Sequence, residues 1–69
     1  MRYRVKYTLR QWRMLAGLTQ EEFADKVGRE RTTIVRWESG KTQPKADDIA
    51  KIEQVLKIKW SDDIIVPKE

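Results

Sequence analysis

Cysteine and histidine are both absent from this chain, and their absence excludes several classes of protein at once. Disulfide frameworks and thiol nucleophiles need cysteine, an imidazole base needs histidine, and structural zinc sites are built almost entirely from these two residues. We therefore expect no metal, no cofactor and no covalent cross-link. An apolar core must supply the stability, and 69 residues is close to the lower limit for such a core.

Long apolar runs are absent as well. No segment approaches the roughly 18 residues that a membrane span requires. The N-terminal residues MRYRVKY also lack the apolar stretch of a secretory signal. We expect a cytoplasmic protein with no membrane partner, folded as a single domain over residues 1–69. A second domain for a small-molecule effector or for self-cleavage is not expected.

Positive charge is concentrated in two segments, although the net charge is only +4. Residues 1–13 hold five basic and no acidic side chains, and residues 26–45 hold six basic against two acidic ones. Residues 14–25, in contrast, hold three acidic side chains and no basic one. A surface with this distribution of charge is typical of proteins that bind phosphate groups of nucleic acids.

Two short helices joined by a glycine turn are predicted in the middle of the chain. Thr19 and Glu22 have the spacing of a capping box, which predicts a helix from about residue 20. Gly28 is suited to end that helix, and Gly40 is suited to end a second helix over residues 31–39.

The second of these helices has two different sides. At roughly 100° per residue, Ile34 and Trp37 point inward. The opposite side, which we call the outer face, consists of Arg31, Thr32, Val35, Arg36 and Ser39. Arginine can pair with a guanine edge, threonine can bond to a base or a phosphate, and valine can contact a thymine methyl group. A merely solvated helix face is the alternative interpretation, but the basic segments favour binding to DNA.

Two further helices complete the predicted helical part. Thr8 and Gln11 form another capping pair, which predicts a helix from Leu9 to a point before Gly17. Its expected inner side consists of Leu9, Trp12, Leu15 and Ala16. Pro44 precedes a helix over about residues 46–56. The expected apolar face of that helix consists of Ile49, Ile52, Val55 and Leu56, and packing is the expected role of Trp12, Trp37 and Trp60.

The two ends of the chain predict short strands. Alternation at the N-terminal end is carried by Tyr3, Val5 and Tyr7. Residues 64–66 are β-branched and are followed by Pro67, which favours a strand there over a helical turn capped by Ser61. Because a lone strand exposes unpaired backbone groups, we expect the two strands to pair either with each other or across a dimer.

Acidic residues near the predicted fourth helix do not indicate an enzyme. Asp47, Asp48 and Glu53 are candidates for a catalytic carboxylate pair, but no nucleophile or metal-ligand set accompanies them. A polar helix face explains them, and no catalytic residue is assigned.

The chain contains, in this order, Arg13, TQEE, the Val27–Gly28 turn, and TIVRWESGK followed by Pro44. Over about residues 8–58 these motifs resemble the helix-turn-helix of phage repressors and Cro proteins, also called the XRE family. The resemblance implies a mainly α, compact, lambda-repressor-like domain of four to five helices, to which the strands predicted at the two ends would add a small terminal β ladder. The helix-turn-helix itself covers residues 19–40.

This resemblance also implies individual roles. The implied base contacts are Arg31, Thr32 and Arg36, with Val35 as an apolar neighbour, and the implied phosphate contacts are Gln20, Lys41 and Thr42. Arg13 and Glu38 match a structural salt bridge of the family. Arg29 replaces a usual apolar residue and is expected to turn outward to a phosphate. Glu30 replaces the usual small capping residue, so the cap must be replaced or forgone. Ser39 replaces the more common asparagine.

The favoured hypothesis is a sequence-specific regulator of transcription that binds double-stranded DNA. By resemblance it is a Cro-like protein or small phage or prophage repressor, acting as a dimer on a palindromic operator with half-sites about 34 Å apart. An antitoxin with the same fold is one alternative. A protein-interaction module that has lost DNA binding is another, for which we expect an acidic or apolar outer face.

Overall fold

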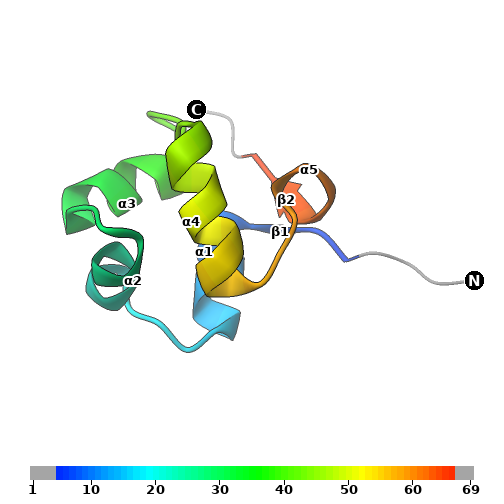
Figure 1. Ribbon diagram of the computed structural model, residues 1–69, viewed down its shortest axis with the longest axis horizontal. Coiled ribbons are helices and arrows are strands. Elements are labelled where there is room, and N and C mark those ends of the chain that lie inside the picture. Colours follow the sequence, from blue (N-terminus) through cyan, green and yellow to red (C-terminus); the bar gives the residue numbers. More distant parts are fainter. Residues whose placement is uncertain (1–4, 67–69) are drawn as a thin grey trace, which may run out of the picture.

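The computed structural model describes residues 5–66. Within these residues, five helices and two short strands follow one another, and Figure 1 shows how they are arranged. In chain order they are β1 (Tyr7–Thr8), α1 (Leu9–Leu15), α2 (Gln20–Val27), α3 (Arg31–Ser39), α4 (Ala46–Leu56), α5 (Trp60–Asp63) and β2 (Ile64–Ile65). The prediction of a mainly α domain with a small terminal ladder is therefore confirmed.

Both predicted capping boxes are present at the starts of α1 and α2. The backbone N–H of Gln11 donates to the Thr8 hydroxyl over 3.2 Å, and the N–H of Thr8 donates to the Gln11 side chain over 2.9 Å. Glu22 and Thr19 make the same two bonds at 3.0 and 2.9 Å. The backbone N–H of Thr19 donates to the carboxylate of Glu22, and this bond holds the pKa of Glu22 below its usual value. These local bonds fix where each helix begins.

Glycines in left-handed conformation end α2 and α3. Gly28 has φ 74° and Gly40 has φ 82°, a region that favours glycine because a Cβ atom is strained there. Only residues 28–30 separate the two helices, so the chain turns sharply between them. The predicted bounds of both helices are confirmed.

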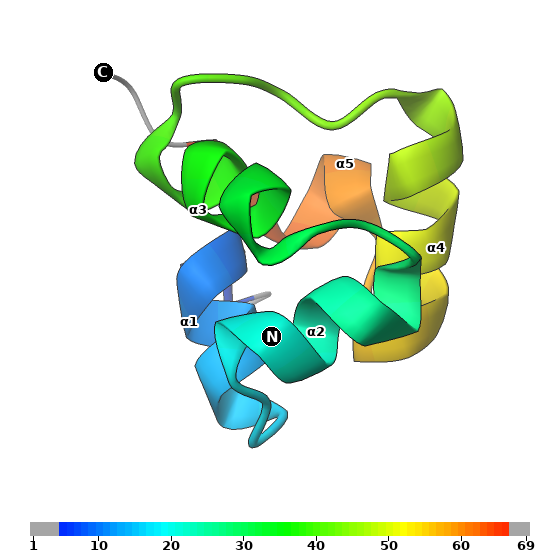
Figure 2. The same cartoon turned by 90° about the vertical axis from the view of Figure 1, so that its left-hand side faces the viewer.

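The core lies where α2, α3 and α4 meet. Phe23, Ile34 and Ile52 are fully enclosed at 0% exposure. Within residues 5–66, the hydrophobic core cluster consists of Leu9, Phe23, Ala24, Val27, Ile34, Trp37, Ile52, Ile58 and Ile64. In Figure 2, α1 and α4 stand on opposite sides of the molecule, with α2 in front and α5 behind. Within residues 5–66, no helix is long and apolar enough to cross a membrane.

The predicted inner side of α1 is partly wrong. Leu9 is buried and Trp12 is half-buried, but Leu15 is 65% exposed and Ala16 is exposed as well. The inward position one turn after Leu9 is occupied by Arg13, which is 8% exposed. A buried arginine is stable only with hydrogen-bond partners, and Arg13 finds them on other elements.

Strands β1 and β2 pair with each other in parallel, with Tyr7 opposite Ile64 and Thr8 opposite Ile65. Of the two expected pairings, the one within a single chain is therefore present. The sequence-based rejection of a helical turn near Ser61 is wrong, because α5 precedes β2. Strand β2 is correspondingly short and does not include residue 66. The N-terminal strand was predicted too long, since Val5 is exposed and lies outside β1. The expectations for Tyr3 and Pro67 lie outside the described residues.

Tryptophan side chains attach this C-terminal segment to the helices. The indole N–H of Trp12 donates to the carbonyl of Asp63 over 2.8 Å, and its ring meets Tyr7 edge-on with ring centres 5.0 Å apart. Trp37 is buried, whereas Trp12 and Trp60 pack partly buried against the core. The expected packing role of all three tryptophans is confirmed.

Candidate nucleic-acid interface

Helix α3 divides into a buried and an exposed side, as the sequence predicts. Ile34 is 0% and Trp37 4% exposed, and both contribute to the core. All five residues of the outer face are exposed: Arg31, Thr32, Val35, Arg36 and Ser39. Together with Lys41 they line a shallow depression. No other element therefore covers the side of α3 that carries the two guanidinium groups and the hydroxyls, within the part of the chain that the structure describes.

One hydroxyl of the outer face already donates its proton within the protein. Ser39 Oγ donates to the carbonyl of Arg36 over 3.2 Å, so it remains an acceptor for a ligand. Val35 is 39% exposed and presents an apolar surface between the polar residues. The face thus offers guanidinium donors, hydroxyl groups and one apolar contact side by side.

A buried ion pair connects α1 and α3 beneath this face. Arg13 on α1 donates from Nε to Glu38 Oε2 over 2.6 Å and from Nη2 to Glu38 Oε1 over 3.2 Å. A third Arg13 nitrogen, Nη1, donates to the carbonyl of Leu18 over 2.7 Å. The Arg13 and Glu38 side chains are only 9% and 4% exposed. The ion pair that the family resemblance implies is present, and it holds α1 against α3.

Gln20 joins the same carboxylate from the start of α2. Its Nε2 donates to Glu38 Oε1 over 3.1 Å. Gln20 and Arg31 also line one groove between α2 and α3, so the start of α2 lies beside the outer face. The first backbone N–H groups of a helix have no partners within the helix, and they favour anions such as phosphate.

The loop after α3 borders the other end of the outer face. The backbone N–H of Lys41 donates to the carbonyl of Arg36 over 3.0 Å, which fixes the first loop residue against the helix end. Lys41 and Thr42 are both exposed. Their side chains are therefore accessible to a ligand that covers α3.

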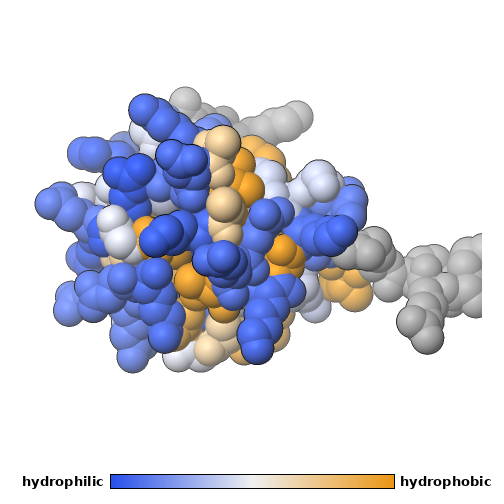
Figure 3. All heavy atoms as spheres, viewed as in Figure 1, coloured by the Kyte–Doolittle hydropathy of each residue, from blue (hydrophilic) through white to orange (hydrophobic). Residues whose placement is uncertain are grey.

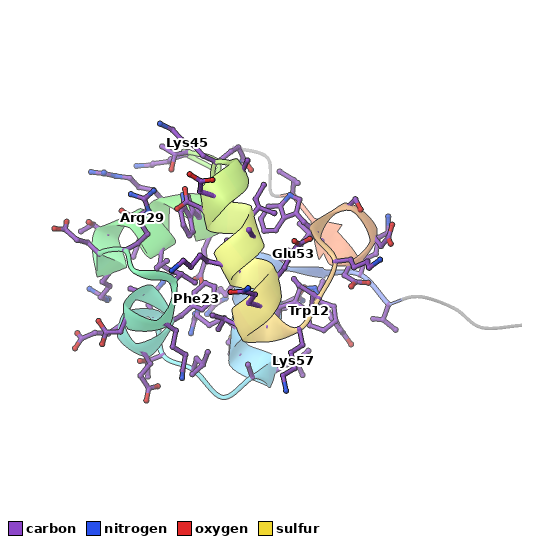
Figure 4. All side chains as sticks on the ribbon, viewed as in Figure 1. Trp12, Phe23, Arg29, Lys45, Glu53 and Lys57 are labelled. Atoms are coloured by element: carbon purple, nitrogen blue, oxygen red, sulfur yellow. The ribbon has the colours of Figure 1, made fainter. Side chains whose placement is uncertain are left out.

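Arg29 does not extend freely outward, contrary to expectation. Its Nε donates to Asp48 Oδ1 on α4 over 2.7 Å, and Figure 4 shows Arg29 directed toward the start of α4 near Lys45. Asp48 is 6% exposed, and a buried carboxylate requires such a partner. Arg29 thus attaches the turn between α2 and α3 to α4, and part of its charge is neutralised.

Asp48 has a structural role, and the interpretation that it belongs to a polar helix face is wrong, because its side chain is buried. Besides the bond from Arg29, it accepts the backbone N–H of Lys45 at Oδ2 over 3.1 Å. Burial raises the pKa of Asp48, but these two hydrogen bonds lower it by more, so the pKa lies below its usual value. Asp48 stands three residues after Lys45, which directly precedes α4. This is the spacing of a capping box, and it could have predicted the role of Asp48 from the sequence.

Helix α3 begins without a side-chain cap. Glu30 precedes the helix, is exposed, and makes no capping hydrogen bond through its side chain. Of the two expected outcomes, the cap is forgone rather than replaced. Figure 3 shows hydrophilic side chains gathered over the end of the molecule formed by α2 and α3.

Comparison with known proteins agrees with this arrangement. The helix-turn-helix family model matches residues 9–62. A protein of Archaeoglobus fulgidus described as an uncharacterized HTH-type transcriptional regulator is 41% identical over 61 residues, which cover 88% of this chain and 87% of that protein. No solved structure matches the chain at a significant level.

Proposed function

Because the chain belongs to the XRE-type helix-turn-helix family, we propose that it regulates transcription by binding a specific sequence of double-stranded DNA. The observation that carries this proposal is the exposed outer face of α3, which is basic and hydroxylated while the opposite side is anchored in the core. An acidic or apolar face would favour a protein partner instead. The face has the chemistry of base-edge recognition in the major groove.

Base contacts are assigned to four side chains of this face. Arg31 and Arg36 each present two parallel N–H donors that fit the O6 and N7 acceptors of guanine. Thr32 supplies a hydroxyl for a base edge, and Val35 supplies an apolar contact for a thymine methyl group. No catalytic step is proposed, because binding alone accounts for these residues.

Phosphate contacts are assigned to both borders of the outer face. Gln20 and the first amides of α2 would bind a phosphate on one side, and Lys41 and Thr42 would bind the opposite strand. Arg29 is placed last among these contacts, since its Nε is already engaged by Asp48 and the side chain is 47% exposed. These contacts position the protein without specifying a sequence.

A dimer on a palindromic operator is the finer form of the proposal. One outer face of nine residues' length covers only a few base pairs, and two copies related by a two-fold axis double the specified sequence. Promoter occlusion by a small Cro-like repressor of a phage, prophage or mobile element is the mechanism that we propose. Control would then depend on protein concentration and dimerisation.

Selection of bound duplexes from a random pool tests this function. We expect a two-fold symmetric consensus whose half-sites lie about 34 Å, or 10 base pairs, apart. The doubly substituted R31A/R36A protein is the control, and it should enrich no consensus under the same conditions. Enrichment of unrelated duplexes by the unmodified protein would contradict specific recognition, and an asymmetric consensus would contradict the dimer.

A further inference from the structure

We infer that Glu38 is a positioning residue for DNA binding. Its buried carboxylate orients the side-chain amide of Gln20 so that an N–H, and not the carbonyl oxygen, faces the DNA backbone. The inference rests on the proposed function, in which Gln20 contacts a phosphate. It assigns Glu38 a role beyond its ion pair with Arg13.

The first step concerns the chemistry of the carboxylate. An ionised carboxylate only accepts hydrogen bonds, so the group of Gln20 that faces it must be the amide nitrogen and not the carbonyl oxygen. The 3.1 Å bond from Gln20 Nε2 to Glu38 Oε1 has this arrangement. The same carboxylate accepts two bonds from Arg13, so its position does not depend on Gln20.

The second step concerns what remains of the amide. A glutamine NH₂ group has two N–H bonds, and one of them points to Glu38. The second N–H of the same nitrogen remains to donate to a phosphate oxygen at the start of α2. A phosphate, like a carboxylate, only accepts, so a flipped Gln20 that presented its carbonyl oxygen there would repel the DNA backbone.

The third step concerns burial. The Glu38 side chain is 4% exposed and the Arg13 side chain 9% exposed, so water competes little for these bonds. Arg13 also neutralises the charge of Glu38, which otherwise lies close to the proposed phosphate site. One carboxylate therefore holds α1 against α3 and, at the same time, orients a side chain at the start of α2.

A measurement on the free protein tests the orientation without DNA. In a ¹⁵N-labelled protein, we expect the two side-chain NH₂ protons of Gln20 to be more widely separated in chemical shift than those of an exposed glutamine. They should also exchange more slowly with water. The exposed Gln54 on α4 serves as the internal control, with ordinary shifts and fast exchange. In E38Q the Gln20 resonances should move to the values of Gln54, because an amide at position 38 can either donate or accept. Ordinary Gln20 resonances in the unmodified protein would overturn the inference, even if E38Q failed to fold.

A double-mutant cycle tests the consequence for binding. Affinity for the selected duplex is measured for the unmodified protein, Q20A, E38Q and Q20A/E38Q, each shown by its thermal unfolding curve to be folded at the assay temperature. We expect E38Q to weaken binding about tenfold alone, the scale of one hydrogen bond to a charged group, and less than about twofold in the Q20A background. Equal weakening in both backgrounds would mean that Glu38 acts only on the fold, and would overturn the inference.

Neutral phosphates identify the contact itself. In each test duplex, one phosphate is replaced by a methylphosphonate. Replacement at one position near the start of α2 should weaken binding of the unmodified protein and have little further effect on Q20A or E38Q. If every position affects E38Q as it affects the unmodified protein, Glu38 does not act through this contact. Failure of the unmodified protein to bind any duplex would instead contradict the proposed function, while the amide resonances would still report the orientation of Gln20.

Discussion

Arg36 is the residue whose removal tests base recognition most simply. It is exposed near the C-terminal end of the outer face and lines the depression there. We expect R36A to lose about 1 to 3 kcal/mol of specific binding free energy and to relax the preference at one G·C base pair. Affinities for the consensus and for duplexes altered at each position provide the measurement. Equal losses on specific and random DNA would show that Arg36 contacts only phosphates.

Lys41 is expected to behave differently, because a phosphate contact carries no sequence information. Affinity of K41A should fall by a similar factor on all duplexes, and the slope of log K against log salt concentration should become shallower by about 0.9. K51A is the matched control, since Lys51 is exposed on α4, outside the helix-turn-helix. An unchanged slope for K41A, or an equal change for K51A, would remove Lys41 from the phosphate contacts.

At the scale of single elements, the missing cap of α3 predicts a gain of stability. Serine at position 30 supplies a short hydroxyl that can accept a bond from an N–H of the first turn, which Glu30 does not do. We expect E30S to raise the free energy of unfolding by about 0.5 to 1 kcal/mol, measured by urea denaturation. E30Q removes the same charge without a short oxygen and should give no gain. A gain as large in E30Q would mean that charge, and not capping, limits α3.

The start of α4 predicts a dependence of stability on pH. Because the pKa of Asp48 is lowered in the folded protein, the unfolded chain takes up the proton first as the pH falls. The contribution of Asp48 is therefore complete above the ordinary value of 3.8 and is lost as the pH falls through the lower pKa of the folded state.

Replacement of Asp48 by asparagine tests this dependence. We expect D48N to cost about 1 to 2 kcal/mol at neutral pH, since charge-assisted hydrogen bonds from Arg29 and Lys45 are weakened. Below pH 3.8 the stability curves of D48N and the unmodified protein should converge. D47N, at the exposed neighbouring position, should follow the unmodified protein throughout. A constant difference between D48N and the unmodified protein at every pH would contradict the assignment.

The start of α2 and the ends of α2 and α3 were predictable because their causes are local. Thr19 and Glu22 are three residues apart, and Gly28 and Gly40 directly follow the helices that they end. The inner side of α1 was predicted only in part, because hydropathy alone favours Leu15, whereas Arg13 is buried by partners outside α1. The direction of Arg29 could not be predicted either, since its partner lies 19 residues away on α4.

At the scale of the whole molecule, the sequence predicted that the two strands pair but left open whether they pair with each other or across a dimer. Tyr7 and Ile64 are joined only once the helices between them have packed, and Trp12 then binds the carbonyl of Asp63. The outer face, in contrast, was predictable, because the 3.6-residue repeat of α3 already separates Ile34 and Trp37 from the exposed residues. Its chemical role remains the proposal on which the account depends.

Titration of the ¹⁵N-labelled protein with the selected duplex tests that central proposal most directly. We expect the largest changes in backbone amide resonances in residues 31–36, at Lys41 and Thr42, and at the start of α2. A scrambled duplex should produce much smaller changes in α3. Changes confined to α4 and α5, with the resonances of α3 unaltered, would contradict the account.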